Sequence, residues 1–323
     1  MRRVLVTGAT GGLGLATVAA LRAEGYTVRA TGRNLSSAGR LAAMGAEFVH
    51  ADLTDAATLP ALCDGMDSII HAAALSSPWG SAADFRRINV DATMALFDAA
   101  QATGARFVFV SSPSVYAQAR DQIRLTEDSP LPRRFLNAYA ATKAEAESRV
   151  MAGGGIAVRP RAIVGPDDRV LLPRFFRLID KGHFPLVNGG RALIELTDAR
   201  DVARGLILAE QKAPELRGQV FNISGGQALP LRDIVTAIAG AMGRQLRFRD
   251  LPFAPLRAVT AVTEAVANLL PGRPEPPLTV YGLCTLAFSQ TFDLSRARDR
   301  LGYVPQYDAR ATSMSVAKGR IND

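Results

Sequence analysis

Short apolar runs alternate with segments of helical spacing over the first half of the chain. Residues 2–6 end in an apolar run of strand length, and after a glycine-rich stretch Leu15, Val18 and Leu21 fall on one face of a predicted helix. Five more runs have the length and composition of buried strands: 27–31, 47–51, 68–70, 106–110 and 156–158. Apolar strands that alternate with helices are typical of a parallel sheet covered on both faces. The pattern therefore predicts an α/β fold with a doubly wound parallel sheet.

The first predicted turn carries glycines at a spacing that suits a dinucleotide. Residues 7–14 read Thr-Gly-Ala-Thr-Gly-Gly-Leu-Gly. Gly8 suits a tight turn, Gly11 lets backbone N–H groups approach a pyrophosphate, and Gly14 lets helix and strand pack closely. A glycine pattern alone is weak, but here a strand precedes it and a helix follows. We therefore expect a dinucleotide site at the N-terminus of this helix.

The second predicted strand ends without the acidic residue that usually binds the ribose of NAD. Gly32, Arg33 and Asn34 stand there instead. Glycine removes a charge that would repel a 2′-phosphate, and the Arg33 guanidinium can pair with that phosphate. NADP is therefore favoured over NAD. NAD stays open, because 34 of the 38 basic residues are arginines and Arg33 can also be ordinary surface.

The ends of the third and fourth strands carry an acid and small residues. Asp52 follows the third strand and can accept a hydrogen bond from the adenine amino group. Ala72, Ala73 and Ala74 follow the fourth strand and let the backbone lie flat against a ribose and diphosphate. A solvated aspartate and tight helix packing explain each feature equally well when it is taken singly.

Tyr139 and Lys143 lie four residues apart in a chain that has only four lysines. On a helix this spacing places both side chains on one face, about 5–6 Å apart at their Cβ atoms. An ammonium at that distance is expected to lower the pKa of the phenol, which makes Tyr139 a candidate proton donor or acceptor. An amphipathic helix pair is the alternative interpretation.

Several motifs together resemble the extended short-chain dehydrogenase/reductase family, also called the NAD-dependent epimerase/dehydratase superfamily. The match covers nearly the whole chain, and residues 289–303 resemble the 3β-hydroxysteroid dehydrogenase-like branch. The resemblance implies a Rossmann fold. Besides the Tyr139–Lys143 pair, its motifs are residues 7–14, 52–53, 71–74, 111–116 and 159–166.

The resemblance also implies roles for individual residues. Tyr139 would be the general acid/base, Lys143 would hold the nicotinamide ribose, and Ser112 would bind the substrate oxygen. Ser111 and Ser114 remain alternatives to Ser112. The nucleotide contacts would come from Gly8, Thr10, Gly11, Gly12, Leu13, Gly14, Arg33, Asp52, Leu53, Ala72, Ala73, Ala74, Tyr139, Lys143, Pro160 and Ile163.

Two other positions are compared with the family pattern. Asn89 matches a helix asparagine that braces the fold more often than it reacts. His71 stands where the family often has asparagine, a departure that changes little.

The chain after residue 166 is predicted to contribute residues both to the main lobe and to a smaller lobe. An apolar run at 192–196, followed by Asp198 and a stripe that includes Val202 and Leu206, predicts a strand and a helix that return to the main sheet. Residues 1–166 and 191–223 are assigned to the dinucleotide-binding domain. Residues 167–190 and 224–323 are assigned to a smaller, mainly helical C-terminal substrate lobe.

Two apolar stretches stand out in this substrate lobe. The first lies between Pro255 and Pro271 and is shorter than the roughly 20 residues that span a bilayer. Core packing is its favoured interpretation. With the second stretch, residues 278–288, it also suits a cover over an apolar substrate. The first stretch places these residues at helical spacing: Val259, Val262, Val266, Leu269 and Leu270.

Charge and cysteine content limit the classes of partner. The net charge is +8 and the isoelectric point about 10.0, but the arginines are spread along the chain without interleaved aromatic residues. A nucleic-acid partner is therefore not expected, and a peripheral membrane contact is a minor alternative. Cys63 and Cys284 are isolated, and no spacing suits a metal, so we expect no metal site and a reducing cytoplasm. A homodimer stays open.

The motifs together predict hydride transfer between NADP(H) and a secondary alcohol or ketone. The expected substrate is a hydrophobic, sterol- or acyl-like small molecule. A non-catalytic NADP-binding sensor or assembly factor is an alternative of another class, against which the intact Tyr139–Lys143 pair argues. A sugar-nucleotide epimerase or dehydratase is the enzymatic alternative, kept open by Arg169, Arg174, Arg177 and Arg191.

Overall fold

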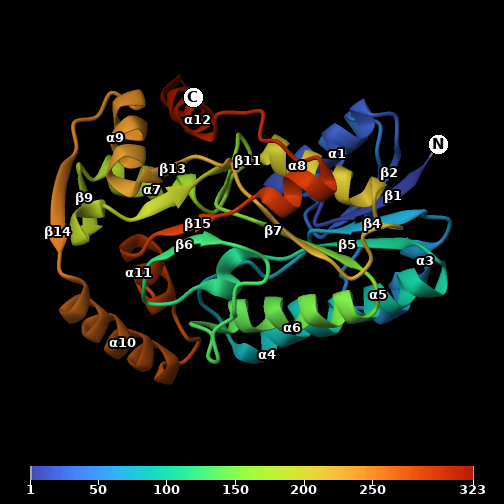
Figure 1. Cartoon of the computed structure of the whole chain (residues 1–323), viewed down its shortest axis with the longest axis horizontal. Helices are drawn as coiled ribbons and strands as arrows, with labels where there is room; N and C mark the ends of the chain where they lie inside the picture. The colour runs from blue at the N-terminus through green and yellow to red at the C-terminus, as the bar shows by residue number, and fades with distance from the viewer. Residues whose placement is uncertain (1, 323) are drawn as a thin grey trace.

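A seven-stranded parallel sheet forms the centre of the larger lobe (Figure 1). The computed structural model describes residues 2–322, and the strand order is β12-β7-β5-β4-β1-β2-β3. Every neighbouring pair in this sheet is parallel, which confirms the predicted α/β fold. The strands are β1 (Arg3–Thr7), β2 (Thr27–Gly32), β3 (Glu47–His50), β4 (Ser68–His71), β5 (Arg106–Val110), β7 (Ile156–Pro160) and β12 (Val220–Ile223).

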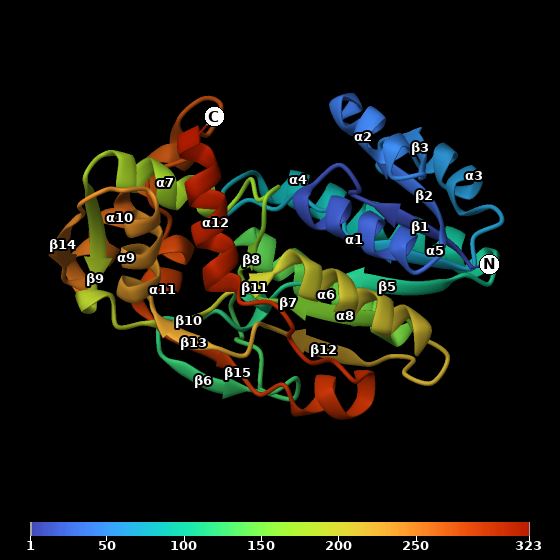
Figure 2. The same ribbon diagram turned by 90° about the horizontal axis from the view of Figure 1, so that it is seen from above.

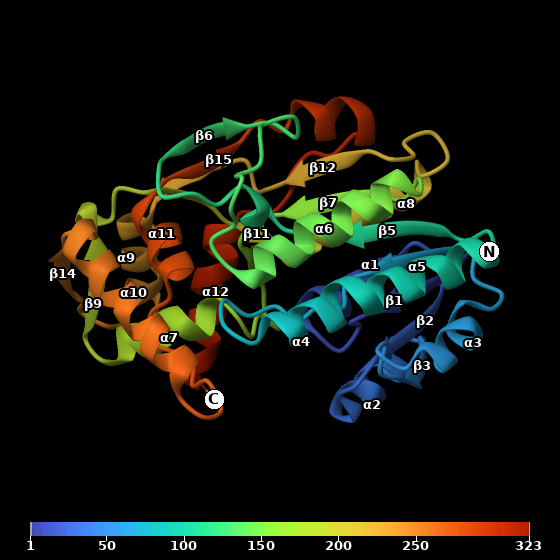
Figure 3. The ribbon, with the colours of Figure 1, turned by 90° about the horizontal axis from the view of Figure 1, so that it is seen from below.

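Helices cover both faces of this sheet, as Figures 2 and 3 show from opposite sides. One face carries α1 (Gly12–Ala23) and α8 (Ala199–Gln211), with α2 (Ala38–Ala43) packing Leu41 into the same core. The opposite face carries α3 (Leu59–Cys63), α4 (Ala82–Arg86), α5 (Ala92–Ala102) and α6 (Ala138–Ala152). The strands alternate apolar side chains between the two cores. Val4 and Val6 pack toward α1, and Leu5 packs toward α3 and α5.

The strand order reverses direction between β1 and β4. The chain runs outward from β1 to β2 and β3, then returns to place β4 against the other edge of β1. At such a switch point the loops after the two strands diverge and leave a crevice at their carboxyl ends. The glycine-rich turn after β1 and the alanines after β4 therefore face each other.

A second sheet has four strands in the order β13-β10-β15-β6. Its strands are β6 (Gln122–Leu125), β10 (Leu193–Glu195), β13 (Ala228–Pro230) and β15 (Gln290–Phe292). The expectation that residues 192–196 return to the main sheet is wrong, because β10 pairs with β13 and β15 instead. Only α8 returns as predicted, and β12 is the strand that joins the main sheet.

The smaller lobe lies beyond the carboxyl ends of the main strands. Its apolar core contains Phe175, Phe184, Leu231 and Ile234. Short pairs β8–β11 and β9–β14 complete the strand pairing. The elements are α7 (Leu172–Asp180), α9 (Leu231–Ala241), α10 (Phe253–Leu269), α11 (Val280–Ala287), α12 (Ala309–Asn322), β8 (Ile163–Val164), β9 (His183–Val187), β11 (Thr197–Asp198) and β14 (Arg247–Leu251).

Helix α10 presents its apolar stripe to solvent. Val262 is 63% exposed and Leu269 is 86% exposed, while Thr260 and Ala267 are the residues that α10 buries. Core packing of this stripe, the favoured interpretation of the sequence, is therefore wrong, because the helix packs through Thr260 and Ala267 and through Phe253 and Leu256 near its start. No helix within residues 2–322 has both the length and the apolar character that crossing a membrane requires.

Candidate active site

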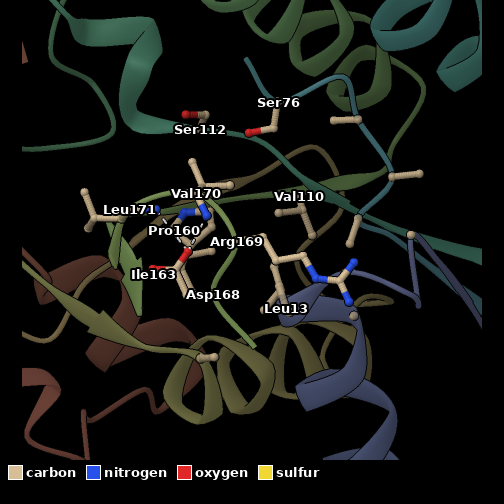
Figure 4. Close-up of a pocket in the computed structure, with 18 of the residues that line it drawn as sticks. Leu13, Ser76, Val110, Ser112, Pro160, Ile163, Asp168, Arg169, Val170 and Leu171 are labelled. Atoms are coloured by element: carbon tan, nitrogen blue, oxygen red, sulfur yellow. Dashed lines mark hydrogen bonds between the residues drawn. The ribbon is translucent and has the colours of Figure 1, made fainter. Parts of the chain in front are cut away.

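A cleft of about 740 Å³ lies at the carboxyl ends of the main strands, between the two lobes. Figure 4 shows Leu13 on one side of this cleft, Val110, Ser112 and Ser76 from the strand ends, and the segment from Asp168 to Leu171 across from them. From the smaller lobe α11 contributes Tyr281, Thr285 and Leu286.

Every site residue expected from the sequence lines this one cleft. The strand ends bring together positions that are up to 155 residues apart in the chain (Gly8 to Ile163). They are Gly8, Thr10, Gly11, Gly12, Leu13, Gly14, Arg33, Asp52, Leu53, Ala72, Ala73, Ala74, Ser112, Tyr139, Lys143, Pro160 and Ile163.

The glycine-rich turn leaves room for a ligand because side chains are excluded from it. Gly8 has a φ of 65°, and a Cβ there would lie 2.7 Å from the backbone nitrogen of Ala73. A Cβ on Gly14 would lie 2.2 Å from the Gly8 carbonyl oxygen. Helix α1 starts after Gly11, which has no side-chain cap, so its first N–H groups stay available to a pyrophosphate. These residues fit a dinucleotide.

The adenosine end of the cleft combines Gly32, Arg33 and Asp52. A Cβ at Gly32 would lie 2.7 Å from Thr10 Oγ1, so no acidic side chain fits there without moving Thr10. Arg33 Nη1 lies 3.9 Å from Asp52 Oδ2, and both side chains are exposed. The hydrogen bond from the Thr54 backbone, followed by weaker effects that include the charge of Arg33, lowers the pKa of Asp52.

The candidate reacting groups sit at the start of α6. Asn137 begins this helix by accepting a hydrogen bond from the Ala140 N–H over 2.9 Å, which fixes the first turn that carries Tyr139. One turn later, Lys143 donates from Nζ to the Val110 carbonyl over 2.6 Å, and Nζ also lies 3.8 Å from the centre of the Phe109 ring. Burial lowers the pKa of Lys143 to about 7.

The pKa of Tyr139 is raised, whereas the sequence led us to expect that Lys143 would lower it. Burial raises the pKa of the phenol, and hydrogen bonds with Ser112 and Ser76 lower it only in part. The effects that determine the pKa of Tyr139 are thus burial, Ser112 and Ser76, and the Lys143 amino group donates to the carbonyl of Val110. Tyr139 is therefore a protonated donor at neutral pH.

Ser112 is the hydroxyl among the three candidates that hydrogen-bonds Tyr139. Ser111 and Ser114 also border the cleft, but their hydroxyls are buried without a hydrogen-bond partner among the described residues. Ser76 was not predicted from the sequence, because it belongs to no recognisable motif. Its position shortly after Ala74, at the end of the fourth strand, is the only sequence feature that points to it.

Asn89 and His71 brace this region. Asn89 Oδ1 accepts from the Leu75 N–H over 2.8 Å, and its Nδ2 donates to Thr142 Oγ1 over 3.3 Å. His71 is buried between two hydroxyls, with Thr7 Oγ1 2.7 Å from Nδ1 and Thr93 Oγ1 2.9 Å from Nε2. Both residues hold the backbone behind the cleft, in accordance with the expectation for Asn89.

Comparison with known proteins identifies the family. The chain belongs to the NAD dependent epimerase/dehydratase family, whose model matches residues 4–224. It is therefore an enzyme that uses a nicotinamide cofactor and has the extended short-chain dehydrogenase/reductase architecture.

Two relatives and one solved structure illustrate the similarity. The chain is 34% identical to a 4-hydroxy-2-methyl-3-oxo-4-farnesyl-3,4-dihydroquinoline-1-oxide ketoreductase of Stigmatella aurantiaca, covering 93% of this chain and 91% of the relative. It is 33% identical to a 2-alkyl-3-oxoalkanoate reductase of Stenotrophomonas maltophilia, covering 94% and 95%. The structure of MoeE5 in complex with UDP-glucuronic acid and NAD is 25% identical, with a TM-score of 0.76 and coverage of 98% and 99%.

Proposed function

We propose that this enzyme reduces a hydrophobic ketone to a secondary alcohol with NADPH, or catalyses the reverse oxidation. The observation that carries the proposal is the convergence of Tyr139, Lys143 and Ser112 at the inner end of a cleft that fits a dinucleotide. The cofactor supplies the hydride for reduction and accepts it in oxidation. Together, one hydride and one proton convert the ketone into the alcohol.

The protein residues would position the carbonyl and deliver the proton. Ser112 would donate a hydrogen bond to the substrate oxygen, and the Tyr139 hydroxyl would transfer its proton to that oxygen as charge develops on it. A raised pKa keeps the Tyr139 phenol protonated at neutral pH, which suits the direction of reduction. Ser76 would also hydrogen-bond the Tyr139 hydroxyl and help to position it.

The NADP preference rests on the second strand end. A side chain at Gly32 would collide with Thr10, so the acid that would bind an unmodified ribose is excluded there. Arg33 is exposed at the edge of the cleft and pairs only loosely with Asp52. Its guanidinium is therefore free to form charge-assisted hydrogen bonds with a 2′-phosphate.

The hydrophobic substrate class is supported by the lining of the outer cleft and by the relatives. Leu171, Phe175, Ile194 and Leu286 give this part of the cleft an apolar wall. The two relatives named above are reductases of ketones that carry alkyl or farnesyl groups.

A sugar-nucleotide epimerase or dehydratase is the second candidate. Arg169 and Arg174 border the cleft and are exposed, and the MoeE5 structure holds a sugar nucleotide beside NAD. Arg174 is already paired with Glu275 at 3.5 Å, however, and a diphosphate would need several free donors. The apolar wall therefore favours the ketone.

The function is tested with Tyr139→Phe and a substrate panel. Hydrophobic ketones and alcohols should change the absorbance of added nicotinamide cofactor, and Tyr139→Phe should lower turnover by roughly 10²–10⁴ while nucleotide affinity changes only a few-fold. Tyr307→Phe, on the surface outside the cleft lining, is the matched control. Near-normal turnover of the Tyr139 variant would exclude the mechanism, and inversion or dehydration of a sugar nucleotide without a net absorbance change would establish the second candidate.

A further inference from the structure

Arg161 is a buried cation that the proposed reaction does not use. It follows β7 and is 8% exposed, and its side chain borders both the main cleft and a small adjoining cavity. The backbone here is fixed. The Arg161 N–H donates to the Ile223 carbonyl over 2.8 Å, the Arg161 carbonyl accepts from the Thr197 hydroxyl, and the Thr197 N–H donates to Ala162 over 3.1 Å.

The guanidinium of Arg161 has no hydrogen bond or ion pair with any described residue, and its Nε is buried without a partner. Arg159, two residues earlier, is buried to a similar extent but pairs with Glu147 and Tyr116. A largely buried guanidinium without a protein partner is costly, because its Nε–H donor has left water and its charge is poorly solvated. Such a group is expected to gain its partner from a ligand.

Glu195, whose charge acts on Arg161, is not the missing partner. Glu195 raises the pKa of Arg161 through its charge, but its carboxylate already accepts hydrogen bonds from the Ser224 hydroxyl and from the Phe292 N–H over 3.0 Å. Burial lowers the pKa of Arg161, and the opposing effects of Tyr281 and then Glu195 do not offset it.

Tyr281 connects Arg161 with the candidate reacting centre. Tyr281 lines the same cleft as Arg161 and Tyr139, and it interacts electrostatically with both residues. An anion bound to Arg161 would therefore share one cavity with a carbonyl held by Tyr139. Phe175 and Leu286 supply apolar surface in the same cavity.

We propose that the substrate is a keto acid, with Arg161 binding its carboxylate while the ketone lies at Tyr139 and the hydrocarbon part lies against the apolar wall. This inference rests on the proposed function and names the substrate class within it. The planar guanidinium can donate two parallel hydrogen bonds to a carboxylate. Arg161 would then select acids over the corresponding esters, without taking part in hydride or proton transfer.

The test compares keto acids of several chain lengths with their methyl esters, using wild type, Arg161→Met and Arg161→Lys. Wild type should prefer the acids, and Arg161→Met should lower kcat/KM for the acids by roughly 10- to 100-fold while the esters change less than about 3-fold. Arg161→Lys should recover part of the preference. Arg310→Met is the matched control, because Arg310 is an exposed arginine on α12 outside the cleft lining, and it should leave the preference unchanged.

Binding and stability distinguish failure of this inference from failure of the proposed function. Decanoate should bind wild type and Tyr139→Phe in the presence of NADP⁺, but at least about 10-fold more weakly to Arg161→Met. The melting temperature of free Arg161→Met should be at or above that of wild type, because an unpaired buried charge has been removed. Equal use of acids and esters by wild type, or unchanged decanoate binding by Arg161→Met, would overturn the inference while the reductase function stands. If wild type turned over none of the keto acids or esters but still bound decanoate more tightly than Arg161→Met does, the reductase function alone would be overturned.

Discussion

Buried ionisable side chains behind the cleft are stabilised in different ways. Arg159 and Glu147 neutralise each other. Lys143 is held by a carbonyl and an aromatic ring, and His71 by two hydroxyls. Burial favours the neutral form of His71, whose two hydrogen-bond partners are both hydroxyls. His71 is therefore expected to contribute to the response of the folded state to acid.

His71 is expected to make the protein less stable between pH 6.5 and pH 3. Burial, with a smaller effect from the charge of Lys143, lowers the pKa of His71 from 6.5 to about 3. Between these values the unfolded chain binds a proton that the folded chain does not, so stability falls as pH falls, by up to about 1.4 kcal/mol per pH unit. His71→Asn should remove this contribution.

Urea unfolding of wild type and His71→Asn at pH 7.5, 6 and 5 measures the effect. The variant is expected to be less stable at pH 7.5, because it loses a hydrogen bond to Thr7 or Thr93, but to lose less stability on acidification. Parallel declines in the two proteins would show that His71 does not control the acid response.

Arg33 is expected to determine cofactor preference. Arg33→Ala should weaken NADP(H) by about 1.5–3 kcal/mol, the size of a hydrogen bond to a charged group, and should change NAD(H) binding little. Titration of both nucleotides measures this, with Arg310→Ala, an exposed position on α12, as the control. Equal affinity of wild type for both nucleotides, or equal weakening of both, would contradict the preference.

At the scale of the elements, the apolar residues of α10 and those of α11 are expected to differ in their contribution to the free energy of unfolding. Val262 on α10 is 63% exposed, whereas Leu283 on α11 is fully buried beside Val187 and Ala287. Val262→Ala should change the free energy of unfolding by less than about 0.5 kcal/mol, and Leu283→Ala should lower it by about 2–5 kcal/mol. Chemical denaturation of the two variants measures the difference. A large loss in Val262→Ala alone would mean that another surface covers α10.

Local patterns predict the strands of the main sheet and the residues of the cleft, because a parallel sheet places successive loops at one edge. The same patterns do not predict which sheet β10 joins, since Ile194 pairs with Gln290 across 96 positions and a short apolar run carries no information about a partner that distant. For a similar reason, the sequence pattern does not indicate that Arg161 and Tyr281 belong to the site. Burial of a lone arginine without a partner is a property of the packed molecule.

At the scale of the whole molecule, an ion pair joins α2 of the nucleotide-binding domain to the loop that carries Asp167. The Nη atoms of Arg40, on α2, donate to both carboxylate oxygens of Asp167 over 2.5 and 2.7 Å. The loop that carries Asp167 lies against the glycine-rich turn, since a Cβ on Gly12 would lie 2.5 Å from the Asp167 carbonyl oxygen. Asp168, in the segment before α7, then accepts hydrogen bonds from three successive N–H groups, at residues 170–172. The pair therefore links the nucleotide-binding domain to the segment that enters the smaller lobe.

We expect this pair to hold the loop over bound nucleotide. Arg40→Ala and Asp167→Asn should each weaken NADP(H) by about 2- to 5-fold, and the double variant should be no weaker than either single one, because a partly exposed pair contributes about 0.2–1 kcal/mol. Nucleotide titration of all four proteins at low and high salt gives the coupling energy, which should shrink as salt screens the pair. If Asp167→Asn left affinity unchanged while Arg40→Ala lowered it, Arg40 would act on the nucleotide directly and the loop would not depend on the pair.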